Sequence, residues 1–254
     1  MPKDQYDSFA DVYDQAPHLE ITNSFIAEVK RSGHLQSEAI DFGCGTGTST
    51  ELLAAHGVSV IGVDRCGKML RHARRRCRRF ERKVRFVTAD LNHLPHFARS
   101  RVAVACGDVV NHIPPKYLPG VLRSIRRSLA PGAVLMFDAI NRFCFERYWT
   151  DQTYFFEGSG GDVVFDCSWD ARRRRGTARV AAYQKRGASF AKQNSVFTEY
   201  LHEDRDMARW LRAAGFVDVQ GKAWSPWSDQ ASQPSLDRTF WTVRTPPENG
   251  NGRA

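Results

Sequence analysis

The feature that most constrains this chain is a glycine-rich loop near its start. Residues 39–47 read AIDFGCGTG, so an apolar stretch ends in an acid and leads into alternating glycines. Glycine lets the backbone turn tightly and approach a ligand with no Cβ in the way. A strand, such a loop and a following helix can together hold a cofactor that contains adenosine.

Two common glycine loops do not match this one. A phosphate-binding loop needs Gly-Lys-Ser or Gly-Lys-Thr, whereas here Gly47 is followed by Thr48. The dinucleotide fingerprint Gly-x-Gly-x-x-Gly also fails, because its third glycine would fall at Thr48. The loop therefore favours an adenosine cofactor that is neither a nucleoside triphosphate nor a dinucleotide.

Two further acids follow short apolar runs. Asp64 comes directly after residues 58–63, and Asp90 comes shortly after residues 84–88. An acid at the first position suits the two hydroxyls of an adenosine ribose, and one at the second suits the adenine amino group. Each acid alone can equally be a helix cap, but both lie in order at the carboxyl ends of successive predicted strands.

Short apolar runs alternate with helical patterns between residues 39 and 140. Interleaved strands and helices form parallel units with right-handed crossovers. We therefore predict an α/β protein with a Rossmann-like, doubly wound and mostly parallel sheet. The predicted strands are residues 39–42, 58–63, 84–88, 102–106 and 133–139, and the predicted helices are residues 48–56, 67–80 and 118–129.

The pattern changes after residue 141 to one that is typical of antiparallel strands. Residues 163–169 and 178–183 alternate in hydropathy and predict a hairpin, and residues 195–201 predict a third strand. A helix at 204–214 and strands at 216–223 and 238–244 follow. We predict five segments: an N-terminal helical lid (1–34), the cofactor-binding core (35–141), an inserted β-rich substrate lobe (142–202), the completion of the core (203–245) and a disordered tail (246–254).

Taken together, these motifs resemble those of class I S-adenosylmethionine-dependent methyltransferases. The run 39–47 is similar to their first motif, Gly62-Val63-Asp64 with Met69 to their second, Ala89-Asp90-Leu91 to their third, and residues 129–133 to the turn before their fifth strand. The resemblance implies S-adenosylmethionine as cofactor and S-adenosylhomocysteine as product. The cofactor-binding residues that it implies are Tyr13, Gly43, Cys44, Gly45, Thr46, Gly47, Asp64, Arg65, Met69, Asp90, Leu91 and Cys106.

The first residues of the chain carry an aromatic stripe. Tyr6, Phe9, Ala10 and Tyr13 share one face at helical spacing, which is also what a helix packed in a core would show. A similar segment forms a lid in small-molecule methyltransferases, including amino-sugar and glycine N-methyltransferases. That resemblance implies that Tyr13 reaches the methionine carboxylate and that Tyr6 lines the acceptor pocket.

The residues after the fourth predicted strand supply candidates for proton transfer. They read DVVNH over 108–112, and His112 is the first candidate for a base because an imidazole titrates near neutral pH. Asp108 and Tyr6 are further catalytic candidates, and Asn111 and His112 are candidate acceptor contacts. The alternative is structural, with His112 packed in the loop and Asn111 capping the next turn.

Acceptor specificity is expected in the inserted lobe. Trp149, Tyr154 and Trp169 offer flat apolar surface there, although core packing explains such aromatics equally well. We expect a small-molecule acceptor, with N-methylation of an amine in natural-product biosynthesis as the first hypothesis. The alternatives are O- or C-methylation of a small metabolite, methylation of tRNA or rRNA, and a regulator that binds the cofactor without chemistry.

Composition narrows the partners and the compartment. The net charge of +9 comes largely from arginines on one predicted helix and at 172–175, a predicted hairpin tip, so nucleic acid is less favoured than a small molecule but stays open. The six cysteines form no paired spacing, which favours free thiols in a cytoplasmic protein without a metal site. No apolar run is long enough to span a membrane. A monomer and a homodimer are both compatible with the sequence.

Overall fold

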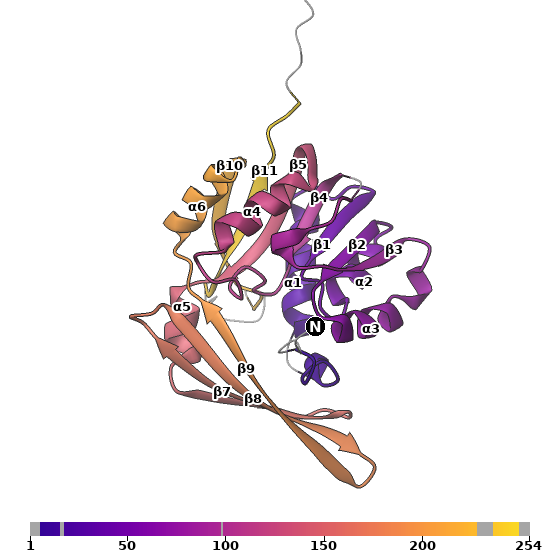
Figure 1. The fold of residues 1–254 in the computed structure, drawn as a ribbon, viewed down its shortest axis with the longest axis vertical. Coiled ribbons are helices and arrows are strands. Elements are labelled where there is room, and N and C mark those ends of the chain that lie inside the picture. The colour runs from indigo at the N-terminus through magenta and orange to yellow at the C-terminus, as the bar shows by residue number, and fades with distance from the viewer. Residues whose placement is uncertain (1–5, 16–17, 98, 228–235, 249–254) are drawn as a thin grey trace, which may run out of the picture.

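The computed structural model describes residues 6–15, 18–97, 99–227 and 236–248. Two sheets organise this part of the chain, a seven-stranded sheet in the core and a four-stranded sheet beside it (Figure 1). The α/β class and the Rossmann-like sheet are therefore confirmed. No helix in these ranges combines the length and apolar character needed to cross a membrane.

The core sheet has the strand order β10-β11-β5-β4-β1-β2-β3. Strands β1 to β5 run parallel, and β11 pairs antiparallel with both β5 and β10. The carboxyl ends of the parallel strands therefore meet at one edge, where ligands of such sheets bind. The strands are β1 (Glu38–Phe42), β2 (Ser59–Asp64), β3 (Val84–Thr88), β4 (Ser100–Ala105), β5 (Leu129–Ile140), β10 (Val217–Trp224) and β11 (Arg238–Arg244).

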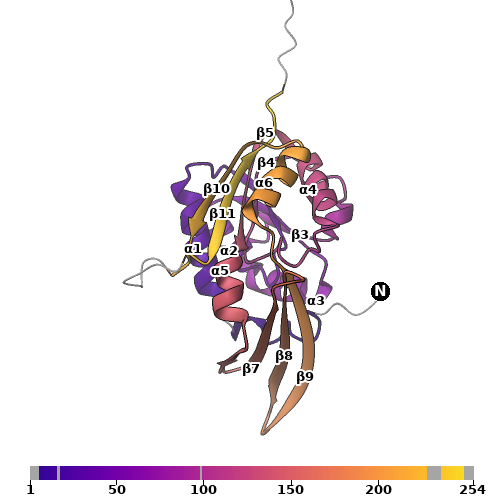
Figure 2. The same cartoon turned by 90° about the vertical axis from the view of Figure 1, so that its left-hand side faces the viewer.

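Helices cover both faces of this sheet, and Figure 2 shows α4 (Leu118–Arg127) and α6 (Asp204–Ala213) opposite α1 (His18–Arg31). In α4, the apolar residues Leu118, Val121, Leu122 and Ile125 recur at helical spacing and are buried against the sheet. On the other face, α1 packs with α2 (Thr48–Ala55) against strands β4 and β5. The helix α3 (Gly67–Arg76) covers the end of the sheet near β2 and β3.

The second sheet is antiparallel with the order β6-β7-β8-β9, and it projects from the core as a twisted ribbon (Figure 1). The hairpin and third strand expected here are confirmed and are longer than predicted. The sequence reasoning missed β6, because its residues show little alternation between polar and apolar types. The strands are β6 (Gln152–Phe156), β7 (Gly161–Asp170), β8 (Arg175–Arg186) and β9 (Ser189–Tyr200). Between β5 and β6 lie α5 (Arg142–Cys144) and the π-helical turn η4 (Phe145–Trp149).

The described residues of the predicted lid, 6–15 and 18–34, do not form one unit over the cavity. Residues 6–15 are a series of turns that ends in η1 (Tyr13–Gln15), whereas α1 is a core helix with Phe25 and Val29 fully buried. Phe9 and Val12 are buried against Phe197 and other side chains of the second sheet. A lid over residues 1–34 is therefore too long a prediction, because the apolar face of α1 has its partner in the core sheet.

Smaller differences concern element ends. The helix predicted to continue to Phe80 ends at Arg76, and a 3₁₀ turn, η2 (Arg78–Phe80), follows. Strand β5 begins at Leu129, where the helix was predicted to end. The predicted tail is partly ordered, since the carbonyl of Pro246 accepts a hydrogen bond from the Gly132 amide at 3.0 Å. Residues 249–254 lie outside the described residues.

Candidate active site

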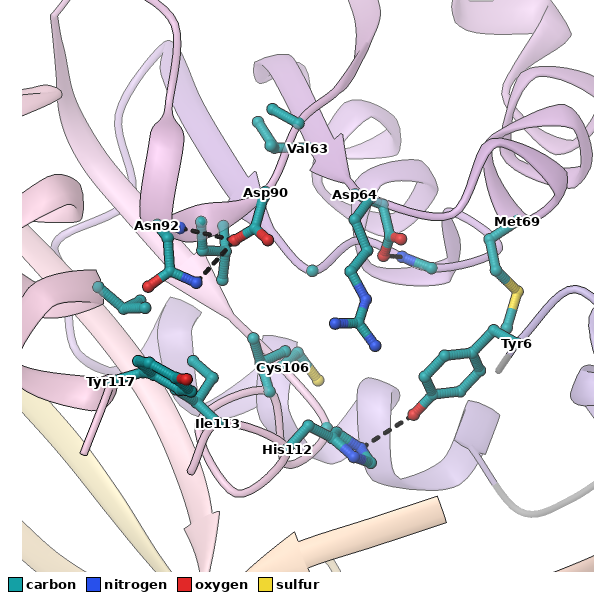
Figure 3. A pocket seen from close by; sticks show the side chains of 18 of the residues that line it. Tyr6, Val63, Asp64, Met69, Asp90, Asn92, Cys106, His112, Ile113 and Tyr117 are labelled. Atoms are coloured by element: carbon teal, nitrogen blue, oxygen red, sulfur yellow. Dashed lines mark hydrogen bonds between the residues drawn. The ribbon is translucent and has the colours of Figure 1, made fainter. Parts of the chain in front are cut away.

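A cavity of about 550 Å³ opens at the carboxyl ends of the parallel strands. The glycine loop, Asp64, Asp90 and the loop after β4 form one side of it, and Figure 3 shows Tyr6 and His112 facing each other across another part. A smaller cavity of about 40 Å³ lies next to it and shares Tyr13, Gly43, Gly45, Cys106 and Gly107 with it.

Eleven of the twelve predicted cofactor residues line one of these two cavities. Cys44 and Thr46 line only the smaller one, and Tyr13, Gly43, Gly45 and Cys106 line both. The exception is Gly47, whose φ of 84° and close packing on α3 explain why a glycine stands there. A Cβ at Gly47 would come within 2.8 Å of the Cβ of Ala73.

The glycine loop is held open by backbone geometry and by Asp64. Gly43 has a φ of +68°, and a Cβ there would lie 2.7 Å from a methyl of Val109. The Asp64 carboxylate accepts hydrogen bonds from the Gly45 amide at 2.9 Å and from the Cys66 amide at 2.8 Å. Asp64 thereby fixes the position of the loop while its side chain lines the main cavity.

Asp41, which ends the apolar run before the glycines, has a structural place. Its carboxylate is fully buried and accepts hydrogen bonds at 2.6 Å from the hydroxyls of Ser49 and Thr50 in the first turn of α2. Burial raises the pKa of Asp41 to about 6, although these two hydrogen bonds oppose the rise. Asp41 therefore ties β1 to α2 directly beneath the loop.

Asp90 lies just past β3 at the opposite end of the cavity from Tyr6 (Figure 3). Its carboxylate accepts hydrogen bonds from the backbone amide of Asn92 at 2.8 Å and from the Asn92 side chain at 2.9 Å. Leu91 and Ile113 add apolar surface next to it. This end of the cavity thus offers a carboxylate beside apolar walls.

Residues 6–15 span the cavity between α3 and the second sheet. On one side, the Asp11 carboxylate accepts hydrogen bonds from Lys68 at 2.7 Å and pairs with His72 at 3.0 Å. On the other side, Tyr6 packs against Phe197 with 4.7 Å between ring centroids. This segment is the part of the predicted lid that covers the cavity.

Two aromatic rings of this region lie close to the smaller cavity. Tyr13 stacks on His18 with 4.0 Å between centroids and an angle of 3° between the rings. Burial lowers the pKa of His18 to about 4, so this imidazole is neutral at physiological pH. Burial also raises the pKa of Tyr13, which keeps its phenol protonated.

The structure joins Tyr6 and His112, which are separated by more than a hundred residues in the sequence. The Tyr6 hydroxyl lies 2.9 Å from Nε2 of His112, and both side chains line the main cavity. Burial is the main cause that raises the pKa of Tyr6 well above its usual range, so the phenol is a donor at neutral pH. Glu199 stands behind them, with Oε1 3.7 Å from the same histidine nitrogen.

Asp108, the second catalytic candidate of this loop, belongs to an ion-pair cluster. Arg238 of β11 donates to Asp108 and, at 2.5 Å, to Asp138 of β5, and Asp138 also accepts from the Gly107 amide at 2.8 Å. Asp108 has a φ of 63° and borders the smaller cavity, not the main one. This geometry disfavours Asp108 as a catalytic base, because its carboxylate pairs with Arg238 and lies outside the lining of the main cavity.

Asn111 was predicted as an acceptor contact, and the structure contradicts this. The side chain is fully buried, donates to the carbonyls of Ile140 and Tyr200 and accepts from the Ile140 amide, all within 3.1 Å. Its hydrogen-bonding groups therefore bind the ends of β5 and β9 and do not reach the cavity.

The aromatic residues proposed for the acceptor site also lie elsewhere. Trp169 stacks on Phe145 at 4.5 Å, Trp149 packs on the same ring, and the Tyr154 hydroxyl donates to the Tyr148 carbonyl at 2.8 Å. None of the three predicted residues is among those that line the main cavity. The large apolar area of these rings is used to join the second sheet to η4.

Sequence reasoning missed several residues of the cavity. Asn92 was one step beyond a predicted motif, and Thr198 and Tyr200 lie at the end of β9, whose position no local pattern gives. The sequence does contain a sign of Glu199: it lies two residues after Phe197, so both side chains share the buried face of β9, where a carboxylate is unusual. The missed lining residues are Val63, Ala89, Asn92, Gly107, Val109, Ile113, Pro114, Tyr117, Val121, Thr198 and Tyr200.

Comparison with protein families identifies the core. Residues 39–132 match the model of the Methyltransferase domain. The matched segment begins in β1, contains the glycine loop, Asp64 and Asp90, and ends in the turn inside β5. Residues 39–132 therefore match a methyltransferase domain, and S-adenosylmethionine is the cofactor that the resemblance of the sequence motifs implies.

Curated relatives share the same part of the chain. YqeM of Bacillus subtilis, named as a methyltransferase, is 28% identical over 155 residues, which is 59% of this chain and 61% of YqeM. The ubiquinone biosynthesis O-methyltransferase of Coxiella burnetii is 25% identical over 127 residues, half of each chain. The match thus spans less than two thirds of the length of these relatives.

Solved structures agree over nearly the whole chain. An S-adenosylmethionine-dependent methyltransferase from Clostridium acetobutylicum covers 96% of this chain and 100% of its own, with 17% identity and a TM-score of 0.77. CalS10, an amino pentose methyltransferase from Micromonospora echinaspora involved in calicheamicin biosynthesis, covers 93% and 95%, with 18% identity and a TM-score of 0.68. The second sheet is therefore part of a fold that these methyltransferases share.

The residues present fit this cofactor. The carboxyl groups of Asp64 and Asp90 line the main cavity, where hydroxyl and amino groups of an adenosine can donate hydrogen bonds to them. The cradle at Gly43 leaves no room for a Cβ. The narrow extension past Tyr13 adds backbone groups of the glycine loop.

Proposed function

We propose that this protein transfers the methyl group of S-adenosylmethionine to an amine of a small molecule in natural-product biosynthesis. The observation that carries the proposal is a single cavity that joins the cofactor motifs to the Tyr6–His112 pair. A cofactor site alone would serve a regulator equally well. A polar pair suited to proton transfer, placed in the same cavity, favours an enzyme.

The cofactor would lie along the sheet edge. In this arrangement Asp64 binds the ribose hydroxyls, Asp90 with Leu91 contacts the adenine, and Met69 packs on its ring. The methionine end would extend toward the smaller cavity next to Tyr13. When bound, S-adenosylmethionine supplies a methyl group that is made electrophilic by the positive sulfur.

The protein then has two tasks, to align the acceptor and to remove one proton. Alignment of two reactants can supply on the order of 7–11 kcal/mol of the barrier. An amine must be neutral to attack, and His112 has the chemistry of a base that works near neutral pH. The Tyr6 hydroxyl, 2.9 Å from Nε2, can pass its proton to His112 while it takes one from the acceptor.

A small acceptor is supported by what closes the cavity. Residues 6–15 cross it, and Thr198 and Tyr200 of β9 border it from the second sheet. The amino pentose methyltransferase CalS10 matches this fold over 93% of the chain, which includes the second sheet. O-methylation stays as the alternative chemistry, since curated relatives include an O-methyltransferase and a hydroxyl acceptor also needs a base.

The test is a screen of amines, amino sugars and hydroxylated metabolites with S-adenosylmethionine, read out by the release of S-adenosylhomocysteine. His112→Asn serves as the variant with an impaired base, and Asp166→Asn, on an exposed part of β7, as the control. If only the hydroxylated compounds are methylated, the protein is an O-methyltransferase and the proposal of N-methylation is wrong. If calorimetry shows no binding of S-adenosylmethionine, the proposed methyltransferase activity is refuted. If tRNA binds tightly and with a steep dependence on salt, the proposal of a small-molecule acceptor is refuted.

A further inference from the structure

We propose that Glu199 is a positioning residue that holds His112 and stabilises the proton that His112 receives. This inference rests on the proposed function and deepens it, because it says which groups hold the proton that is removed from the acceptor. No motif marks Glu199, and it lies on β9, far in sequence from every cofactor residue.

The first argument is geometric. Nε2 of His112 accepts or donates one hydrogen bond with the Tyr6 hydroxyl at 2.9 Å, and Oε1 of Glu199 stands 3.7 Å from the same nitrogen. A neutral nitrogen that accepts from Tyr6 has nothing to donate to a carboxylate. Once the nitrogen carries a proton, the carboxylate forms an ion pair with it. The interaction between Glu199 and His112 therefore becomes stronger as the proton is transferred. Only interactions that strengthen in this way accelerate a reaction.

The second argument is burial. The Glu199 side chain is 8% exposed, and its Oε2 has no hydrogen-bond partner within the part of the chain that the structure describes. An unpaired buried carboxylate is costly, so a nearby group that can carry positive charge stabilises it. His112 is that group, because the phenol of Tyr6 is neutral.

The third argument is the charge of the surroundings. Asp108 and Asp138 share a single guanidinium, that of Arg238, and all three groups act on Glu199 electrostatically. The remaining titratable neighbours are the thiols of Cys144 on α5 and Cys167 on β7, whose pKa values burial raises so that they stay neutral. Together with Glu199, the described groups hold three carboxylates against one arginine. The cluster is short of positive charge, and one proton held between Glu199 and His112 supplies it.

Burial also raises the pKa of Glu199, and the charge of Asp108 adds to this effect. Glu199 and His112 therefore retain one proton between them more strongly than either group would alone. The proton of the acceptor nitrogen passes through the Tyr6 hydroxyl to Nε2 of His112, and the nitrogen keeps its electron pair for the new bond to carbon.

The decisive experiment needs neither cofactor nor acceptor. The Cε1 proton of His112, assigned with His112→Asn, is titrated by NMR in the wild type and in Glu199→Gln. We expect the pKa of His112 to fall by at least about 1 in Glu199→Gln, the lower end for the loss of an opposite charge within 4–6 Å. Glu146→Gln, an exposed carboxylate variant on η4, should leave the titration unchanged. Equal pKa values in the wild type and Glu199→Gln would overturn the proposal.

A second measurement covers the case in which Glu199→Gln does not fold. Burial lowers the pKa values of His18 and His202 to about 4. In the wild type, His112 should titrate well above both. If it titrates together with them, no carboxylate holds its proton and the proposal fails. In a folded Glu199→Gln variant with turnover, the acidic limb of the kcat profile should move to lower pH, with KM little changed. Since the NMR titration is independent of methyl transfer, its outcome separates this inference from the proposed function.

Discussion

Replacement of Asp64 by asparagine tests the cofactor site directly. In the wild type, one carboxylate oxygen accepts from the Gly45 amide at 2.9 Å and the other from the Cys66 amide at 2.8 Å. Asparagine keeps one acceptor oxygen and places an NH₂ group where the second oxygen stood. That group faces a backbone amide, so a donor meets a donor on one side, and the charge offered to a ribose is lost.

The expected loss follows from the strength of charged hydrogen bonds. A hydrogen bond to a charged group contributes about 1.5–3 kcal/mol. Loss of one such bond to the ribose should raise the Kd for S-adenosylmethionine by about tenfold to about 150-fold. The bonds to Gly45 and Cys66 exist without cofactor, so their loss should appear separately, as a lower Tm of the free protein.

Isothermal titration calorimetry with S-adenosylmethionine and S-adenosylhomocysteine measures the first effect, and thermal unfolding measures the second. Asp166→Asn is the matched control, because this carboxylate is 59% exposed and pairs only loosely with Arg179, at 3.8 Å. A Kd for Asp64→Asn within twofold of the control, in a protein with an unchanged Tm, would refute the role assigned to Asp64.

Three further predictions follow from the same structure. His112→Asn should lower kcat by about 10²-fold or more, the usual range for a general base, with little change in KM; steady-state kinetics that show only a raised KM would leave His112 a purely positioning role. Arg238→Met should destabilise the fold by about 3–5 kcal/mol in urea unfolding, because two carboxylates lose their shared partner, and a loss below about 1 kcal/mol would contradict this. The pKa of Asp41 is raised from 3.8 to about 6, so its contribution to stability is present below pH 3.8 and is lost as the pH rises through 6. Between pH 4 and 7, the free energy of unfolding should therefore fall by about 2.4 kcal/mol more in the wild type than in Asp41→Asn, and parallel pH profiles would argue against it.

Much of the lining of the candidate cofactor site could be predicted from sequence because its parts are local. The glycine loop, Asp64 and Asp90 each lie at the end of one strand, and the order of strands in a doubly wound sheet brings such ends together. The same local logic failed for Gly47, since its need for glycine comes from its φ of 84° and from packing against Ala73.

The acceptor side could not be predicted in this way, because its residues meet only through the tertiary fold. Asn111 binds backbone groups 29 and 89 residues away, and no short pattern reveals them. Trp149 and Trp169 are large apolar residues, and sequence cannot tell whether they fill a core or line a pocket. Tyr6 and His112 were named separately, and their contact across 106 residues is a property of the folded chain.

Asn111 also bears on how such a protein can diversify. Its amide joins the loop after β4 to the ends of β5 and β9 through the backbone of Ile140 and Tyr200 alone. Because these hydrogen bonds involve only main-chain atoms of Ile140 and Tyr200, they do not depend on which side chains stand at those two positions. Substitutions of the side chains at Ile140 and Tyr200 can therefore leave these three hydrogen bonds in place, whereas Phe197 between them stays constrained by its contacts with Tyr6 and Phe9.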